Sequence, residues 1–441
     1  MKREIEKQLI AWKISPIRAP LLLRGARQVG KSWIIEKFGR DQFENLVVVN
    51  FEQRREATAC FGTLLPEKIV SAIELLTNSI IHPGKTLLFL DEIQECPHAI
   101  VALRYFKEQM PDLHVIGAGS LLEFVLNDEK FSMPVGRIQF LYLRPLSFYE
   151  FLSACDRENL RDYLGTVSLQ NLPQKVIHDE LLKLVREYIA LGGMPAVIAA
   201  YLQTKSLYQT QGVQSDLLST YRRDFGKYAT KAQHKYLILL FEKVPSLVGT
   251  WFKYNKIDPA VHPREIKTAL KQLCQAGLLY QVHHSSASGL PLVTTQNEKK
   301  FKVLFLDVGL VKRACFLDTA LLFKEDIMLI NQGLLTEQFV GQELLAYSDC
   351  KDEGRLFFWV REQKNSSAEV AFVIPIGNKI IPVEVKAGTT GRLKSLKIFL
   401  EEKNSGIGVR ISANPLAFEN KLLSIPFYLI AELPRLIHEL Q

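Results

Sequence analysis

Eight residues near the start of the chain have the types and spacing of a phosphate-binding loop. The stretch from Gly25 to Ser32 fits the pattern G-x-x-x-x-G-K-S, and it stands between an apolar run and a pattern suited to a helix. The two glycines allow a tight turn in which backbone N–H groups face a polyphosphate. The residues that would bind a nucleotide are Gly25, Ala26, Arg27, Gln28, Val29, Gly30, Lys31, Ser32 and Trp33.

Two side chains of this loop have separate tasks in phosphoryl transfer. The Lys31 ammonium would reach the β- and γ-phosphates, and the Ser32 hydroxyl would ligate Mg²⁺. The sequence therefore predicts ATP and Mg²⁺ as cofactors. The alternative is a glycine-rich turn before a helix that binds nothing.

Two adjacent carboxylates, Asp91 and Glu92, follow an apolar run at residues 86–90 and favour the nucleotide interpretation. In a parallel sheet beside the strand that precedes the loop, Asp91 would lie near Ser32 and hold Mg²⁺ through water. Glu92 would then polarise the attacking water. Together the loop and the carboxylates form the two halves of an ATPase site.

Strands and helices alternate around these residues. Apolar runs at 21–23, 47–51, 87–90 and 114–118 are separated by helical patterns, which predicts a mostly parallel, three-layered α/β sheet. Ser120 follows the last of these strands and could hydrogen-bond the γ-phosphate or the attacking water, or simply form a turn. Arg137 follows in a loop, where it could neutralise developing charge or be solvated.

The composition is that of an ordinary globular protein. The chain has 441 residues, 47% hydrophobic and 23% charged, which indicates two to four domains. Its first residues lack the apolar core of a signal peptide, and the weakly charged run at 188–202 is too short for a bilayer, so we expect a cytoplasmic protein without a membrane partner. The six cysteines show no zinc spacing and are expected to be reduced.

The positive charge is concentrated in one segment. Residues 201–300 hold 14 Lys and Arg against 6 Asp and Glu, an excess that equals the net charge of +8 of the whole chain. A helical pattern at 234–249, a second one that starts at Pro263 and is ended by Gly277, and two strands around a turn at 285–289 give the order of a winged helix. Arg264, Lys267 and Lys271 share one helix face, which would bind a DNA backbone or be solvated.

Several motifs occur in an order that resembles a large bacterial and archaeal family of AAA-class P-loop ATPases with a C-terminal domain of unknown function. They are Gly25-Ala-Arg-Gln-Val-Gly-Lys-Ser, Leu90-Asp-Glu-Ile-Gln, Gly119-Ser-Leu-Leu, Gly136-Arg-Ile, Pro145-Leu-Ser-Phe, Leu191-Gly-Gly-Met-Pro and Phe305-Leu-Asp-Val-Gly-Leu. The resemblance implies an AAA-type core, a winged-helix middle and a nuclease-like C-terminal domain. It also implies that Ser120 is a sensor and Arg137 an arginine finger, serving its own site or that of a neighbour in a homo-oligomer.

The last third of the chain resembles the core of the restriction-endonuclease-like superfamily. A helix at 333–348 carries Glu337 and Glu343, and strands at 356–360, 369–374 and 380–386 precede a helix at about 392–402 and a strand at 407–411. The metal site of that superfamily needs an Asp on the second strand and Glu-x-Lys on the third. Glu384 and Lys386 supply the second part and share a strand face.

The Asp is missing from this pattern, because Ala371 stands in its place. Glu369 lies on the same face about 7 Å along the strand, and Glu343 from the helix could converge with it. We therefore expect a degenerate domain kept for binding or architecture, with an ATP-gated nuclease as the alternative.

The sequence thus predicts an α/β chain in four parts. They are a P-loop domain at 1–155, a helical connector at 156–230, a winged helix at 231–300 and a restriction-endonuclease-like domain at 301–441. The predicted function is a Mg²⁺-dependent ATPase whose nucleotide state controls its C-terminal half, with DNA as a candidate partner. The alternative is a nucleotide-controlled switch that binds DNA or a protein and hydrolyses little ATP.

Overall fold

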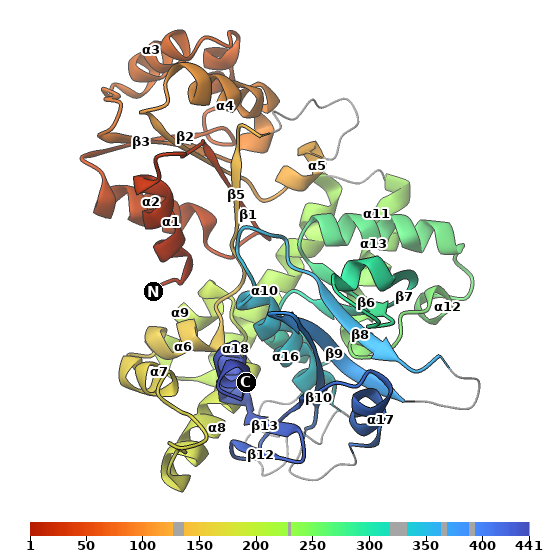
Figure 1. Ribbon diagram of the computed structural model, residues 1–441. Coiled ribbons are helices and arrows are strands. Elements are labelled where there is room, and N and C mark those ends of the chain that lie inside the picture. The colour runs from red at the N-terminus through yellow and green to blue at the C-terminus, as the bar shows by residue number, and fades with distance from the viewer. Residues whose placement is uncertain (127–135, 228–230, 318–332, 363–367, 388–392, 441) are drawn as a thin grey trace. The chain divides into compact units, whose positions relative to one another are not determined.

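The computed structural model describes residues 1–126, 136–227, 231–317, 333–362, 368–387 and 393–440 (Figure 1). The chain forms two compact units. Unit 1 comprises Met1–Arg144, Gln275–Gly277 and Asp349–Glu353, and unit 2 comprises Pro145–Cys274, Leu278–Ser348 and Gly354–Gln441. The first segment of unit 1 thus ends at Arg144, before the predicted boundary at residue 155. The residues after it belong to unit 2, where α6 (Phe148–Ala154) packs on other helices.

Unit 1 is built on a five-stranded parallel sheet, which confirms the predicted fold class. Its strands are β1 (Leu21–Arg24), β2 (Asn45–Asn50), β3 (Thr86–Asp91), β4 (His114–Ala118) and β5 (Gln139–Tyr142), in the order β2-β3-β4-β1-β5. The edge strand β5 was not predicted. Only one of its four residues is fully buried, so it lacks the apolar periodicity that identifies a strand in the sequence.

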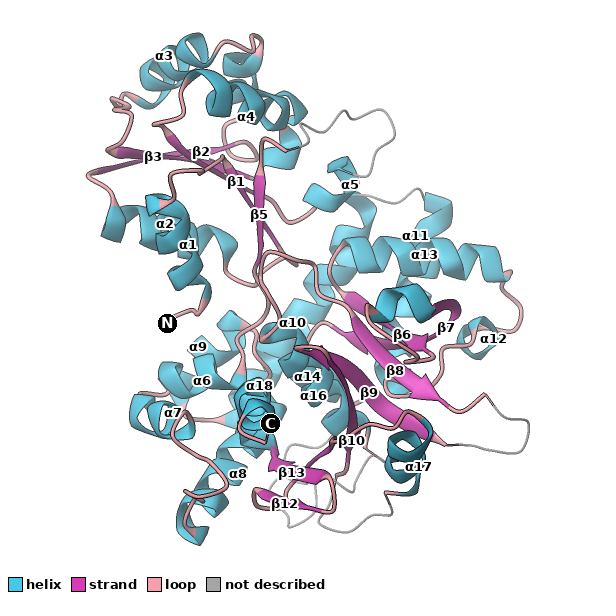
Figure 2. Ribbon diagram, in the orientation of Figure 1, coloured by secondary structure: helices cyan, strands magenta, loops and turns pink. Residues whose placement is uncertain are grey.

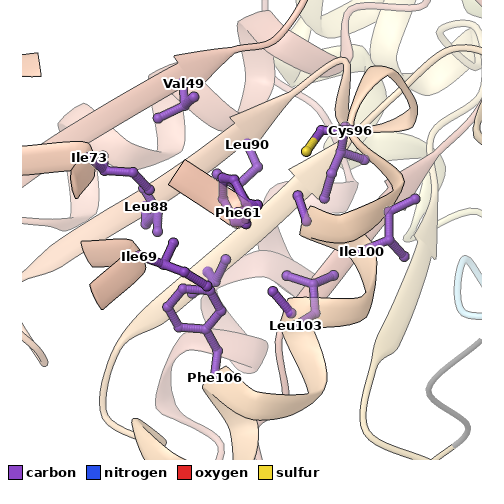
Figure 3. Packing of buried hydrophobic residues seen from close by; sticks show 14 of the residues in the cluster. Val49, Phe61, Ile69, Ile73, Leu88, Leu90, Cys96, Ile100, Leu103 and Phe106 are labelled. Carbon is purple, nitrogen blue, oxygen red and sulfur yellow. The ribbon is translucent and has the colours of Figure 1, made fainter. Parts of the chain in front are cut away.

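Helices cover both faces of this sheet. Figure 1 shows α1 (Ile5–Ile14) and α2 (Lys31–Gln42) on one face, and α3 (Pro66–Thr77) and α4 (Pro97–Gln109) on the other; α5 (Leu122–Leu126) follows β4. Alternate residues of β3, Leu88 and Leu90, pack against Ile69 and Leu103 from the second helix layer (Figure 3). Burial of each such side chain contributes about 1.5–3 kcal/mol, which fixes the strands whose ends carry the polar residues.

Unit 2 combines helices with an eight-stranded mixed sheet (Figure 2). The strand order is β12-β13-β11-β10-β9-β8-β6-β7. The strands are β6 (Leu279–Ser285), β7 (Gln296–Phe305), β8 (Leu356–Val360), β9 (Glu369–Ile376), β10 (Lys379–Val385), β11 (Gly408–Ser412), β12 (Ala417–Glu419) and β13 (Leu422–Pro426). The helices after α6 are α7 (Glu158–Leu164), α8 (Lys175–Leu191), α9 (Pro195–Thr204), α10 (Leu207–Asp224), α11 (Lys231–Lys243), α12 (Tyr254–Ile257), α13 (Pro263–Gln275), α14 (Val308–Ala314), α16 (Leu334–Ala346), α17 (Lys394–Glu402) and α18 (Leu433–His438).

The helix, three strands, helix and strand predicted for the last third are present as α16, β8 to β10, α17 and β11. Residue 392, the predicted start of α17, lies outside the described residues. The boundary predicted at residue 300 needs correction, since it falls inside β7. Strand β6 pairs with both β7 and β8, so the predicted winged helix and the C-terminal strands share one sheet.

The second strand of the predicted winged helix also begins later than expected. Residues Leu292–Thr295 form a 3₁₀ turn, and β7 starts only at Gln296. Pro291 has no N–H to donate to a strand partner, which disfavours a strand at this place.

Three of the motifs that carry the family resemblance meet in a buried junction of unit 2. The Leu146 N–H donates to Gly193 O at 2.7 Å, and the Gly193 N–H donates to Asp307 Oδ2 at 2.6 Å. A side chain at Gly193 would place its Cβ 2.1 Å from Leu146 O, so only glycine fits. These motifs therefore hold the start of unit 2 to its helices.

None of the described helices is long and apolar enough to span a bilayer.

Candidate functional site

The loop between β1 and α2 has the backbone of a phosphate-binding turn. Gly25 has φ 141°, and a Cβ at this position would lie 2.2 Å from Leu143 O. Gln28 and Gly30 also have positive φ, of 65° and 96°, so the chain reverses sharply and α2 begins at Lys31. The first N–H groups of α2 lack intrahelical acceptors and, with the helix dipole, favour an anion.

Lys31 is buried inside this turn. Its Nζ donates to Gly25 O at 2.9 Å and to Ala26 O at 2.8 Å. Burial lowers the pKa of Lys31 to about 8, although the nearby Glu92 and Asp91 oppose that effect. A loop that holds a desolvated ammonium this way fits an anionic ligand, whose charge would restore the ordinary pKa.

Ser32, Asp91 and Asn50 form a hydrogen-bonded group at the carboxyl end of the sheet. The Ser32 hydroxyl donates to Asp91 Oδ1 at 3.0 Å, and the Asn50 amide donates to Asp91 Oδ2 at 2.8 Å. Burial raises the pKa of Asp91, and the Ser32 bond lowers it. A hydroxyl and a carboxylate oxygen this close fit Mg²⁺, which would neutralise charge on the phosphate oxygens when bound.

One feature of this arrangement differs from the prediction. Strand β3 does not lie beside β1, because β4 stands between them. Ser32 still reaches Asp91, since α2 leaves β1 and packs across β4, β3 and β2.

Glu92 is held by two other residues of the site. Gln94 Nε2 donates to Glu92 Oε2 at 2.7 Å, and the Ser120 hydroxyl donates to the same oxygen at 3.4 Å. Glu92 has φ 49° and ψ 45°, a left-handed backbone conformation that is uncommon for this residue type. A Cβ at Gly119 would lie 1.9 Å from Gln94 Oε1, so the glycine before Ser120 leaves room for the glutamine.

Two functional candidates, Asn50 and Gln94, were missed in the sequence. Asn50 ends the strand next to β3 and pairs with Asp91 in the sheet register. A polar residue at the end of a predicted strand was the available signal, as it was for Ser120. Gln94 lies in the Leu90 to Gln94 motif, and its contact with Glu92 gives that motif a physical reason.

The other loop residues divide by exposure. Ala26 and Val29 are buried and pack the turn, whereas Gln28 and Trp33 are exposed. Trp33, the third residue of α2, has 46% of its surface exposed beside the loop.

Arg137 lies at the opposite edge of the sheet from the loop. Gln139, the first residue of β5, pairs with Leu21, the first residue of β1, so Arg137 precedes the amino ends of the strands. The Arg137 Nε donates to Glu108 Oε1 at 3.0 Å. The four residues of β1 span about 13 Å, which separates Arg137 from the loop of its own chain.

The residues predicted for a degenerate nuclease site are only partly together. Glu384 Oε1 pairs with Lys386 Nζ at 2.5 Å, and Glu369 Oε1 pairs with Lys302 Nζ at 2.5 Å. Ala371 is buried on β9, next to the Glu369 end of the strand.

Glu343 does not join this group, which corrects the prediction. Both of its carboxylate oxygens accept from the Phe148 N–H, at 3.0 and 3.2 Å, and burial raises its pKa to about 8. Glu337 is the carboxylate of α16 that faces Lys302. Six residues separate Glu337 from Glu343, so the two point about 120° apart around the helix. In the described part of the chain, no group of three or more His, Cys, Asp and Glu residues is placed to hold a metal ion.

The basic residues predicted on one helix face lie on α13. Arg264, Lys267 and Lys271 are exposed, and the opposite face buries Ile266 and Leu270. None of the three cations forms an ion pair with a described residue.

Comparison with protein families assigns the first part of the chain. Residues 18–152 match a family model described as an AAA domain. Residues 182–321 and 332–428 match two models described as domains of unknown function, and the first of these runs across the predicted boundaries at 230 and 300. A comparison with curated proteins found no match.

Solved structures with partial similarity include a Walker-type ATPase, an Orc1 protein in complex with DNA and a branch-migration motor. A Walker-type ATPase of Pyrococcus abyssi has a TM-score of 0.45 and 13% identity, covering 71% of this chain and 95% of that one. The Orc1 protein of Aeropyrum pernix in complex with DNA has a TM-score of 0.29 and 15% identity, covering 71% and 91%. The RuvB Holliday-junction branch-migration motor of Thermotoga maritima has a TM-score of 0.31 and 15% identity, covering 63% and 89%.

These TM-scores are too low to support a functional argument, whereas the family match and the loop geometry agree with each other. Residues 18–152 thus form a P-loop domain of the AAA type, and two regions of unknown function follow it.

Proposed function

We propose that this chain hydrolyses ATP with Mg²⁺. The observation that carries the proposal is the 3.0 Å hydrogen bond from Ser32 to Asp91, in the loop where Lys31 is buried. Lys31 would bind the β- and γ-phosphates, Ser32 and Asp91 would hold Mg²⁺, and Glu92 would accept a proton from the attacking water. Ser120 would sense the γ-phosphate through its contact with Glu92.

Steady-state ATP hydrolysis of the full chain tests this proposal. We expect Glu92→Gln to lower kcat by about 100-fold or more while nucleotide binding persists, because a positioned base contributes 10²–10⁴-fold. Glu95→Gln is the matched control, since Glu95 lies three residues further along and is exposed. A Lys31→Ala protein that hydrolyses ATP at the wild-type rate would refute the assignment.

We also propose that hydrolysis is directed by DNA. The support is the exposed basic face of α13, whose three cations form no ion pair with the residues that the structure describes. Such cations can neutralise phosphates, with a strong dependence on salt. We expect duplex DNA to stimulate hydrolysis by the wild type and not by a variant with Arg264, Lys267 and Lys271 changed to Gln. A hydrolysis rate that DNA does not change at low salt would favour protein partners. It would also favour the alternative of a switch, in which the nucleotide state repositions the C-terminal half.

We propose that Arg137 acts as an arginine finger toward a neighbouring copy in a homo-oligomer. The support is its position before the amino ends of the strands, whereas the phosphate-binding loop follows the carboxyl end of β1. Mixing Lys31→Ala with Arg137→Ala should then restore hydrolysis, because each copy supplies what the other lacks. Arg104→Ala is the control, since Arg104 pairs with the same Glu108.

A further inference from the structure

The restriction-endonuclease resemblance implies a metal ion among the carboxylates of the C-terminal sheet. The position of the Lys302 side chain disfavours such an ion. Lys302 on β7 is only 2% exposed, although it carries a charge. Its Nζ lies 2.7 Å from Glu337 Oε1 on α16 and 2.5 Å from Glu369 Oε1 on β9. A cation of the protein itself thus stands between two of the carboxylates.

The surrounding contacts fix this lysine in place. The Trp251 indole N–H donates to Glu369 Oε2 at 2.6 Å, and Trp251 also forms a backbone bridge with Lys302. The Lys302 Nζ lies 5.2 Å from the centre of the Phe358 ring, within the range of a cation–π interaction. Both oxygens of Glu369 are therefore engaged by residues of the chain.

Charge and donor chemistry disfavour a divalent ion at this place. A metal bound to Glu337 and Glu369 would lie next to a buried ammonium, which would repel it strongly in a medium of low dielectric constant. Ala371 supplies no ligand where the superfamily has an Asp, and Glu384 is already paired with Lys386. The residues present do not fit the metal site that the resemblance implies.

We propose that Lys302 is the resident cation of this carboxylate cluster and takes the place of the metal ion. The cluster then serves as a joint between three segments far apart in the sequence, namely β7, α16 and β9. A buried ion pair of this kind holds its partners in register, because separating one partner leaves an uncompensated buried charge. The C-terminal domain accordingly does not cleave nucleic acid by a metal-dependent reaction.

One carboxylate oxygen near this cluster is still available to a metal ion. Glu384 Oε2 is buried and has no described residue within hydrogen-bonding geometry, although the nearby Ala371 backbone opposes the rise that burial causes in the pKa of this carboxyl. A metal ion in this domain would have that buried oxygen as a ligand, so Glu384→Gln separates the two possibilities.

The first test is a Mn²⁺ titration of nucleotide-free, full-length protein that carries Asp91→Asn, which removes the P-loop carboxylate. We expect no bound Mn²⁺ and no DNA cleavage. The proposal would be overturned by Mn²⁺ binding that disappears when Glu384→Gln is added. DNA cleavage that disappears on adding Glu384→Gln would overturn it as well.

The second test concerns the joint itself. We expect Lys302→Met to lower the melting temperature of the protein. Added Mn²⁺ should raise the melting temperature of this variant again. The further changes Glu337→Gln and Glu369→Gln should restore the melting temperature without metal. Lys300→Met is the matched control, since Lys300 lies on the same strand and pairs with the exposed Glu362 at 3.0 Å. A Lys302→Met protein that melts like the wild type would contradict the joint; if this variant does not fold, the neutral triple variant and the Mn²⁺ titration decide.

Discussion

Asp91 is held from two sides, and the two contacts have different origins. Ser32 comes from the loop and reaches one carboxylate oxygen, whereas Asn50 comes from the neighbouring strand and reaches the other. The side-chain oxygen Oδ1 of Asn50 accepts from the N–H groups of Glu52 and Gln53, at 3.0 and 2.9 Å, which fixes the orientation of the side-chain amide. Asn50 thus positions the carboxylate that would hold the metal.

Asn50→Asp should raise the Mg²⁺ concentration needed for half-maximal ATP hydrolysis by about 10-fold or more, since outer-shell partners typically change metal affinity by 10–100-fold. The replacement places a second negative oxygen against Asp91 and removes the donor. The measurement is hydrolysis against Mg²⁺ at fixed ATP. Asn45→Asp is the control, because Asn45 begins the same strand at the other edge and bonds Ile80 O; equal shifts in both variants would exclude a positioning role.

The lowered pKa of Lys31 predicts how ATP binding depends on pH. Below the pKa of about 8 the ammonium is charged in the free protein, so affinity should be constant. Above it, ATP must first restore the proton, and affinity should fall by about tenfold for each further pH unit. Equilibrium binding of ATP between neutral and alkaline pH measures this decline, and Lys31→Met should bind weakly without it. Wild-type affinity that stays level past this pKa would contradict the burial of the ammonium.

At the scale of elements, strand order decides which residues meet. Helix α2 crosses from β1 over β4 to β3 and β2, which carries Ser32 to a carboxylate two strands away. In unit 2, helix α16 directs its two carboxylates to different partners, because they lie on different sides of the helix. Glu337 faces the lysine of β7, and Glu343 faces the first turn of α6, where it caps the Phe148 N–H.

Glu343→Gln should stabilise the protein at neutral pH. Burial raises the pKa of Glu343 from 4.5 in the unfolded chain to about 8 in the folded protein. The contribution of Glu343 to the free energy of unfolding is therefore fully present below pH 4.5 and is lost as pH rises toward 8. The neutral amide removes this loss, which is on the order of 3 kcal/mol at pH 7. Denaturant unfolding at several pH values measures it. The wild type and the variant should converge near pH 4, and a constant difference at all pH values would contradict the shifted carboxyl.

At the scale of the whole molecule, the chain consists of two compact units with separate cores. The P-loop residues, Asp91 and Glu92 all belong to unit 1, whereas the basic helix α13, apart from its last residue, and the Lys302 cluster belong to unit 2. A ligand that binds one unit stabilises that unit by mass action.

Thermal unfolding should therefore show two transitions, and Mg²⁺ with ATP should raise only one of them. Glu92→Gln is suited to the experiment because it should bind nucleotide without consuming it. At a ligand concentration 100 times the Kd the gain is about 2.7 kcal/mol. Calorimetry with and without nucleotide measures the shift, and Lys31→Ala should show none; a single transition that moves as a whole would show that the units unfold together.

Features that depend only on neighbouring residues could be predicted from the amino-acid sequence. The P-loop needs glycines at fixed spacing and a helix directly after them, so Gly25, Gly30, Lys31 and Ser32 could be recognised without a structure. The carboxylates that end β3 and the alternation of strands and helices are local in the same sense. These features were sufficient to predict the α/β class and the core of the candidate ATP site.

The tertiary structure alone decided which distant residues meet. The insertion of β4 between β1 and β3, the joining of β6 to β8, and the contact of Asn50 with Asp91 all depend on strand order, which no local pattern encodes. The choice of Glu337 over Glu343 depends on how α16 rotates against the sheet. Lys302 shows the reason most directly, because the carboxylates that make its burial favourable lie 35 and 67 residues away in the chain.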